Sequence, residues 1–304
     1  MANTLLLGTQ GSAWHQWLKD NRKGRDLILL DPADAHHGPA GRLWLIHDDR
    51  STSRFYGSTD PQRSPHVMVL ALAEFLTEAR PDALVQLFAY RPTPLLSQLA
   101  QLIAFLVKPE QILIDQETPI SQGGWPTGPE EIDLPAGLPP MVVDAQRKAQ
   151  WLKLIERCQP HQIPLQSCVI QGARLGSGHS LDEPTRHRAG LANALHAETC
   201  GSTLLIVADE DPDEENISRA LDVTHTARAQ IVRADAYDDL LCAFVRPSGD
   251  EFGFGMIERI DFAEGLIHAR TDAIPPVPVP ILRLGSMRVD KDGRERGEAK
   301  PWQV

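Results

Sequence analysis

Cysteine and long apolar runs are both scarce in this sequence. Its four cysteines are scattered over 304 residues without a C-x-x-C pair, which fits neither a zinc module nor a disulfide framework. The apolar N-terminal stretch holds only three consecutive leucines, too few for a secretory signal, and no run approaches the ~20 residues of a membrane-spanning helix. We therefore expect a cytoplasmic protein without membrane association.

Positive charge is also in short supply. The chain has 30 Lys and Arg against 41 Asp and Glu, a formal net charge of −11. This balance argues against a protein that holds nucleic acid through bulk charge alone, so any polyanion site has to be local. With 42% hydrophobic residues, the chain can bury the cores of about two domains.

Short apolar runs alternate with amphipathic segments in residues 1–118. The predicted strands are residues 4–7, 26–31, 42–47, 83–88 and 112–114, and the predicted helices are residues 12–20, 67–78 and 95–106. Strands separated by helices of this length predict right-handed crossovers. We expect an α/β fold with a parallel sheet and flanking helices.

The second half of the chain changes character twice. Proline and glycine are dense in residues 119–141, which predicts a linker or surface excursion without regular structure. A polar helix is predicted at 142–157, followed by mixed α/β structure to residue 238. Residues 239–304 contain short strands between Gly and Pro turns and predict a small β-rich C-terminal domain.

A strand, a glycine turn and a helix open the chain. This is the place of a phosphate-binding loop, because backbone N–H groups and the helix N-terminus attract anions there. Counted from Gly8, however, the motif G-x-x-x-x-G-K-[ST] meets Ala13, Trp14 and His15. Trp14 brings no cation for phosphate oxygens, and His15 is a poor magnesium ligand. The pattern predicts that ordinary ATP-dependent phosphoryl transfer is disabled; the alternative is a plain strand–helix turn in which Trp14 and Trp17 pack.

Two acids follow the second predicted strand. Asp31 ends it and Asp34 lies three residues on, where folds of this kind place carboxylates that hold magnesium directly or through water. Asp-Pro-Ala-Asp is also good turn chemistry, so turn capping is the alternative.

Two other clusters invite a metal interpretation. Adjacent His36 and His37 have no third ligand at useful spacing, and the acidic run 209–215 lacks the spaced ligands of a calcium loop. We expect the acidic run to be a solvated helix start.

Six blocks spread over most of the chain resemble one protein family. They are D-P-A-D-A-H-H-G-P-A-G-R-L at 31–43, F-Y-G-S-T-D-P at 55–61, L-V-K-P-E-Q-I-L-I at 106–114, and residues 143–157, 253–262 and 284–298. In that order they are similar to the D-x-D-x-G-Q segment, the F-x-G-S-T-S-P block, the L-x-K-P-D strand entry, the arginine-bearing lid and two parts of the terminal β domain of the RNA polynucleotide 5′-hydroxyl kinases. These are P-loop proteins of RNA processing, including archaeal members.

The resemblance implies a P-loop kinase-like core in 1–118, a lid-like helix with further α/β structure in 142–238, and the terminal β domain in 239–304. It implies ATP and Mg²⁺ as cofactors of an active member. The implied vestigial nucleotide site consists of Gly8, Thr9, Gln10, Gly11, Ser12, Ala13, Trp14, His15, Asp31 and Asp34. The candidates for lid or RNA contacts are Gly57, Ser58, Thr59, Arg147, Lys148 and Trp151.

The basic set on the predicted helix 142–157 has two interpretations. Arg147 and Lys148 could meet RNA phosphates while Trp151 stacks a base. The alternative is an amphipathic helix with solvated cations.

The departures from the family fall in its catalytic machinery. Besides the lost Walker A motif, the second acid of D-x-D is Ala33, the following G-Q is replaced within 35–37, and the D-T-x-G strand end becomes A-Y-R at 89–91. Together these features position ATP, magnesium and the attacking hydroxyl in active members. The resemblance therefore implies ancestry rather than activity.

Three functional hypotheses follow. The first is a catalytically degenerate relative that binds RNA or an RNA-processing protein. The second is an active kinase in which backbone N–H groups of 8–12 cradle phosphates and Asp31 or Asp34 handles the metal. The third is an unrelated role of the same fold, such as a dimeric structural protein. The sequence specifies neither the RNA class, nor the partner, nor the oligomeric state.

Overall fold

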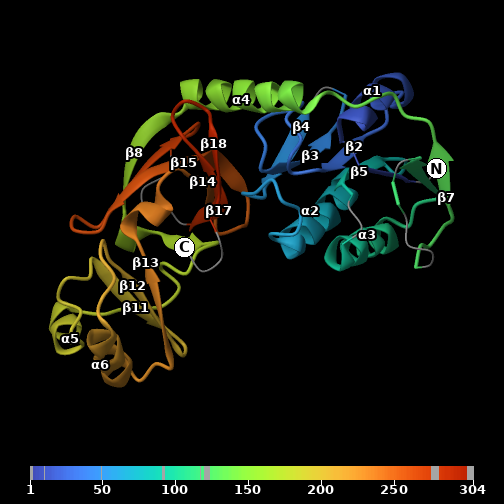
Figure 1. Ribbon diagram of the computed structural model, residues 1–304. Helices are drawn as coiled ribbons and strands as arrows, with labels where there is room; N and C mark the ends of the chain where they lie inside the picture. Colours follow the sequence, from blue (N-terminus) through green and yellow to red (C-terminus); the bar gives the residue numbers. More distant parts are fainter. Residues whose placement is uncertain are drawn as a thin grey trace. The chain divides into compact units, whose positions relative to one another are not determined.

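The computed structural model describes residues 3–9, 11–48, 50–90, 93–116, 118–119, 124–274 and 281–299 (Figure 1). The chain forms two compact units, Met1–Trp151 and Leu152–Val304, here called unit 1 and unit 2. Among the described residues, no helix combines the length and apolar character that crossing a membrane requires.

Unit 1 is built on a seven-stranded sheet in the order β4-β3-β2-β5-β1-β6-β7. Its strands are β1 (Thr4–Gly8), β2 (Leu27–Leu30), β3 (Arg42–Ile46), β4 (Ser51–Phe55), β5 (Leu84–Ala89), β6 (Gln111–Asp115) and β7 (Pro129–Ile132). Its helices are α1 (Gly11–Asn21), α2 (Pro65–Glu78), α3 (Pro94–Val107) and α4 (Pro140–Arg157), the last of which continues into unit 2. Strands β2, β5, β1, β6 and β7 run parallel, which confirms the predicted α/β fold with a parallel sheet and flanking helices.

Helices cover both faces of this sheet. Leu5 and Leu7 of β1 lie in the core that contains α2 and α3, whereas Leu6 lies in a second cluster with Trp14 and Leu18 of α1. Successive residues of a strand point to opposite faces, so three leucines in a row serve two cores. Burial of each such side chain stabilises the fold by about 1.5–3 kcal/mol relative to its exposure.

Two expectations for unit 1 need correction. Residues 42–47 were predicted as a parallel strand, but β3 pairs antiparallel with β2 and β4. The connection between β2 and β3 contains no helix, and a parallel return normally requires a crossover of a dozen or more residues. The excursion 119–141 was predicted to lack regular structure, but β7 lies within it and pairs with β6. Pro129 is tolerated there because it begins an edge strand.

Unit 2 consists of two sheets. The larger has the order β18-β17-β14-β15-β16-β8, with β9 on β17, and the smaller has the order β10-β11-β12-β13. The larger sheet contains β8 (Gln159–Pro164), β9 (Val169–Gln171), β14 (Leu240–Val245), β15 (Glu251–Asp261), β16 (Leu266–Thr271), β17 (Ile281–Val289) and β18 (Glu295–Glu298). The smaller contains β10 (His179–Ser180), β11 (His196–Cys200), β12 (Thr203–Val207) and β13 (Arg228–Val232), with helices α5 (Glu183–Arg188) and α6 (Glu214–Thr224). Two short 3₁₀ helices span Leu165–Ser167 and Ala234–Tyr237. The β-rich character predicted for the C-terminal segment is confirmed.

Candidate functional site at the carboxyl edge of the unit 1 sheet

The indole of Trp14 is buried beside the turn between β1 and α1. Trp14 is 1% exposed and packs with Leu6, Leu18 and Leu113. A side-chain carbon on Gly8 would lie 2.4 Å from Nε1 of Trp14, so only glycine lets the indole approach the turn this closely. Nε1 of Trp14 is buried without a hydrogen-bond partner among the described residues. The indole is therefore a core group.

The first residue of the turn donates to a carboxylate of the chain itself. The backbone N–H of Thr9 donates to Oδ2 of Asp115 over 3.1 Å, and the Thr9 hydroxyl lies 3.3 Å from the same oxygen. The hydroxyl of Thr118 donates to it as well, over 3.1 Å. Asp115 ends β6 and is buried. The backbone N–H of Thr9, which a bound phosphate would require as a donor, therefore already donates to the Asp115 carboxylate.

A second carboxyl group lies against the start of α1. Oδ2 of Asp31 is 2.5 Å from the point where a Cβ on Gly11 would lie, and Nε2 of Gln86 donates to the Gly11 carbonyl over 3.4 Å. Asp31 is 5% exposed, and one backbone N–H, that of Ala33, donates to its Oδ1 over 3.0 Å. Burial, reinforced by Asp34, raises the pKa of Asp31 to about 7.

The carboxylate of Asp34 contacts a histidine ring at hydrogen-bond distance. Its Oδ2 lies 2.9 Å from Nδ1 of His36, and its Oδ1 accepts the His36 backbone N–H over 2.9 Å. Burial alone would raise the pKa of Asp34, but these contacts outweigh it and hold the pKa below its usual value. The ring of His15 stacks on His36 at 3.7 Å, and burial together with His36 lowers the pKa of His15 to about 4. Asp34 is thus a charged acid with a partner, and His15 is a neutral ring near pH 7.

A cavity of about 260 Å³ opens beside these groups. It is lined by Thr9, Ala13, Asp115, Gln116, Asp133, Leu134, Pro135, Ala136 and Gly137. It lies where β1, β6 and β7 end, and the carboxyl ends of strands are where open α/β sheets bind ligands. Two of its side chains, Asp115 and Asp133, are acids. The lining favours a neutral or cationic group over a phosphate.

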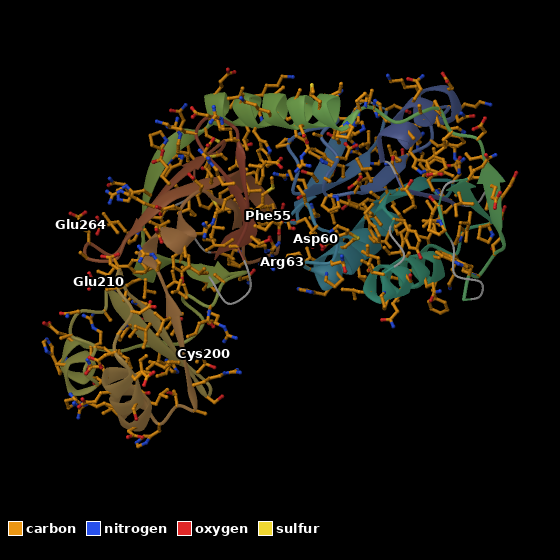
Figure 2. The ribbon with its side chains drawn as sticks, in the orientation of Figure 1. Phe55, Asp60, Arg63, Cys200, Glu210 and Glu264 are labelled. Atoms are coloured by element: carbon orange, nitrogen blue, oxygen red, sulfur yellow. The ribbon has the colours of Figure 1, made fainter. Side chains whose placement is uncertain are left out.

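The block at 55–61 forms a packed turn between β4 and α2 (Figure 2). The backbone N–H groups of Tyr56 and Gly57 both donate to the Gly41 carbonyl over 2.9 Å, and Gly57 has a φ of 76°. Ser58 is 1% exposed, and its hydroxyl accepts the Asp60 N–H over 2.9 Å. The described contacts of Ser58 therefore hold the turn together, while Thr59 is partly exposed.

The candidates on α4 differ in exposure. Lys148 is exposed and Arg147 is half-buried, with its charge lowering the pKa of Asp31. Trp151 is 0% exposed, which argues against the interpretation that its ring stacks an RNA base. Trp151 and Leu154 lie three residues apart on the buried stripe of the helix, and helical periodicity directs both to the same side.

The structure thus brings together Thr9, Gly11 and Asp31 at the carboxyl edge of the sheet. Gln10 lies outside the described residues, and only the backbone of Ser12 is described, within α1. Sequence reasoning missed Asp115, Gln86 and Thr118. A signal existed for Asp115, because it ends a buried strand just as Asp31 does.

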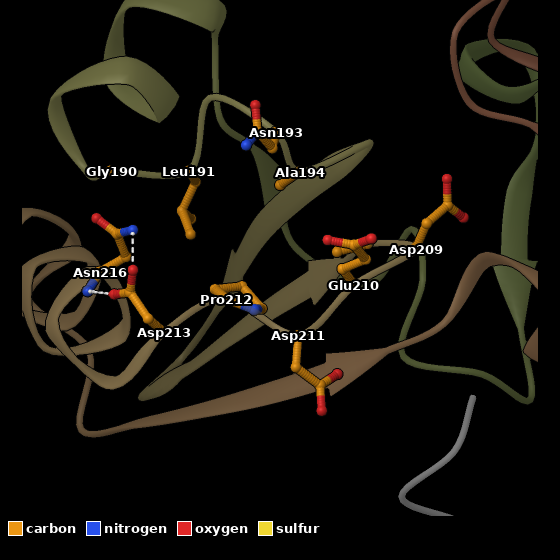
Figure 3. A pocket seen from close by; sticks show the side chains of 11 residues that line it. Gly190, Leu191, Asn193, Ala194, Asp209, Glu210, Asp211, Pro212, Asp213 and Asn216 are labelled. Carbon is orange, nitrogen blue, oxygen red and sulfur yellow. Dashed lines mark hydrogen bonds between the residues drawn. The ribbon is translucent and has the colours of Figure 1, made fainter.

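A larger cavity, of about 520 Å³, lies in unit 2 beside the acidic run (Figure 3). Asp213 caps α6 there, accepting the Asn216 backbone N–H over 2.7 Å and its side-chain amide over 3.0 Å. This confirms the helix start expected for the run. Within the described ranges, no group of three or more His, Cys, Asp or Glu side chains has the arrangement of a metal site.

Comparisons with known proteins find a likeness in structure alone. No family model and no curated protein sequence matches the chain. A solved structure of a wild-type Clp1p–Pcf11p complex matches with a TM-score of 0.51 and 10% identity, covering 94% of this chain and 74% of that one. A second structure, of an extended interface between Pcf11p and Clp1p, has a TM-score of 0.49 and 9% identity, covering 94% and 75%. The first likeness supports a P-loop kinase-like fold.

Proposed function

We propose that the chain is a catalytically degenerate relative of the polynucleotide 5′-hydroxyl kinases that acts as an RNA- or protein-binding component of RNA processing. One observation carries this proposal. The turn that would wrap a phosphate contacts the chain's own groups, namely Trp14 beside Gly8, Asp115 on the N–H of Thr9 and Asp31 beside Gly11.

These residues do not fit ATP and Mg²⁺. A triphosphate at the turn would meet the Asp115 carboxylate at short range, and like charges in a low dielectric repel strongly. The lysine that would offset this repulsion is replaced by a buried indole. One of the two candidate metal ligands, Asp34, also pairs with His36 over 2.9 Å.

Support for an RNA-processing role is of two kinds. The solved structures that the chain resembles are complexes of Clp1p with Pcf11p, which suggests a protein partner. On the chain itself, Lys153 and Arg157 of α4 are exposed and lie four residues apart on one face of the helix, which gives a short cationic strip on an otherwise acidic protein. Lys148 is exposed on another side of the same helix.

The catalytic half of the proposal is tested by calorimetry with ATP and Mg²⁺, together with transfer of labelled phosphate to a 5′-hydroxyl RNA oligomer. We expect neither binding nor transfer, with an active polynucleotide kinase as the positive control. The triple variant Trp14→Gly, Ala13→Gly, His15→Ser should also be inactive, because it adds space without a lysine. Turnover of ATP by the wild type would overturn the degenerate interpretation.

The binding half is tested with a fluorescent single-stranded RNA and anisotropy at several salt concentrations. Lys148→Glu and Lys153→Glu should each weaken binding and lower the salt slope by about 1 if α4 contacts phosphates. Lys291→Glu, an exposed lysine of unit 2, is the matched control. If the α4 variants bind RNA as tightly as the wild type, α4 does not contact the RNA. If the wild type does not bind RNA at all, the RNA-binding form of the proposal is wrong and only binding to a protein partner remains.

A second candidate function is an active kinase with a substitute cation. Arg147 favours it, because its charge acts on Asp31 beside the turn. In this case Arg147→Ala would abolish phosphate transfer while leaving the circular dichroism spectrum unchanged. Lys148→Ala on the next position of the helix would retain activity.

A further inference from the structure

Helix α3 contains no charged residue, although 23% of the chain is charged. Its sequence, P-L-L-S-Q-L-A-Q-L-I-A-F-L-V, is apolar almost all round. The inner side packs into the unit 1 core through Leu96, Leu99 and Ile103. The other side, which in a surface helix normally carries charge, is apolar as well.

Exposed apolar side chains lie on the outer side of α3 and on the neighbouring helix α2. The two helices contact each other on the same face of the sheet (Figure 1). The exposed side chains are Phe105 at 67%, Leu70 at 62%, Leu102 at 45%, Leu95 at 41% and Leu106 at 36%. We call these five residues the α2–α3 face. On α3 they follow helical spacing and form one stripe, interrupted by the uncharged Gln98.

A helix that is apolar all round is normally buried on all sides. A membrane span does not account for the outer side, because 14 residues fall short of the ~20 that a span needs. The α2–α3 face therefore has the character of a protein interface.

We propose that the α2–α3 face binds a second copy of this chain in a twofold-symmetric dimer. In such an interface each residue near the axis meets its own counterpart, so any charge there meets a like charge. A face without charged residues can contact an identical face without repulsion between like charges, even though each copy carries a net charge of −11. On α2, Glu74 beside the face is paired with Arg54 over 2.6 Å, while His66 and Glu78 lie at the two ends of the helix.

The size of the face fits a second copy. The exposed fractions of its five side chains amount to roughly 400–500 Å² of apolar surface. A symmetric dimer buries this area twice, and the resulting ~1,000 Å² reaches the lower limit of specific interfaces. The uncharged polar residues between the apolar ones, such as Gln98 and Thr77, add to the area.

The first test is sedimentation velocity of the full chain between about 1 and 100 µM, where a dimer of this area is expected to form. Phe105→Glu and Leu102→Glu should each weaken association by at least about tenfold, because two carboxylates would meet across the axis. Met141→Glu is the matched control, since Met141 is 82% exposed and lies on α4. Unchanged melting curves will show that the variants fold.

The second test separates self-association from binding of another protein. Phe105→Glu and Phe105→Lys should each be monomeric alone, and mixing them should restore a dimer, because opposite charges then meet across the interface. A wild-type chain that stays monomeric over the whole range would overturn the proposal. So would a dimer that Phe105→Glu and Leu102→Glu leave intact.

Discussion

Two buried aspartates at the opposite ends of β2 have opposite acidities. Asp26, just before the strand, is 0% exposed, and Asp31, just after it, is 5% exposed. Arg80 donates to Asp26 from Nε over 3.0 Å and from its backbone N–H over 2.8 Å, and Nδ1 of His47 lies 3.1 Å away. Burial alone would raise the pKa of Asp26, but these partners hold it at about 2. Among the described residues no guanidinium donates to Asp31 in this way, and its pKa rises to about 7.

The comparison shows that burial raises the pKa of both carboxyl groups and that cationic partners reverse this shift only at Asp26. At the amino edge of the sheet, Arg80 and His47 pair with the Asp26 carboxylate. A buried charge destabilises the fold unless it is paired in this way. At the carboxyl edge, burial and the nearby Asp34 destabilise the charged form of Asp31. Groups with strongly shifted pKa values cluster at functional sites, which supports the choice of the carboxyl edge as the site.

The largest effect is expected from Asp26→Asn, which removes the matched charge. We expect a loss of about 3 kcal/mol at pH 7, at the low end for a broken buried pair because Arg80 is half-exposed and regains water. The pKa of Asp26 is depressed, so its contribution is present above about pH 4 and is lost as pH falls toward 2. The variant should lack this acid dependence.

Urea unfolding at pH 7 and pH 3 measures the loss. Tryptophan fluorescence reports unit 1 in particular, because five of the six tryptophans precede residue 152. Asp48→Asn is the control, since Asp48 is exposed and lies 3.4 Å from the same guanidinium. An equal loss in both variants would contradict the importance of burial.

The opposite sign is expected for Asp31→Asn. The pKa of Asp31 is raised, so the folded state loses stability as pH rises toward and through 7. An amide keeps the acceptor for the Ala33 N–H and carries no charge. The variant should therefore match the wild type below pH 4 and exceed it by about 2 kcal/mol above pH 7. A variant that is less stable than the wild type at pH 8 would refute the account of Asp31.

A smaller effect is expected from His15→Gln. The pKa of His15 is lowered to about 4, so the folded state resists protonation and loses stability as pH falls from about 6.5 toward 4. After allowance for the partial exposure of the ring, the variant should recover about 1 kcal/mol at pH 4.5 relative to pH 7.

The smallest effect is expected from Thr9→Val, which removes one hydroxyl contact to Asp115 and keeps the backbone donor. The loss should be about 0.5 kcal/mol. Thr118→Val, which removes the other hydroxyl from the same oxygen, should behave alike. A loss of several kcal/mol from either would mean that Asp115 depends on these hydroxyls and not on the N–H of Thr9.

Much of the fold was accessible from the sequence, because apolar periodicity is a local signal. It located the strands at 4–7 and 83–88 and the helix at 95–106 close to β1, β5 and α3. The direction of β3 was not accessible, because it depends on what the connection after β2 can span. Strand β4 was missed because S-T-S-R-F has no alternating apolar pattern.

Only part of the candidate site could be predicted from the sequence. Counting from Gly8 predicted that Trp14 stands at the lysine position of a Walker A motif, but only three-dimensional packing shows that the indole lies in the core beside Gly8. Asp115 comes to Thr9 from 106 residues away along the chain, and no pattern in one sequence links two such positions. The burial of Trp151 depends on its surroundings as well, since aromatic residues on a basic helix are equally typical of exposed nucleic-acid contacts.

The packing of Trp14 also constrains how this turn can change over evolutionary time. A Trp14→Lys replacement would place an ammonium among Leu6, Leu18 and Leu113, where desolvation is costly. The space left by the indole would add the cost of a cavity. The replacement would therefore make the chain less stable before the cation could be of any use. The packing thus restricts position 14 to large apolar side chains that fill the space between Leu6, Leu18 and Leu113.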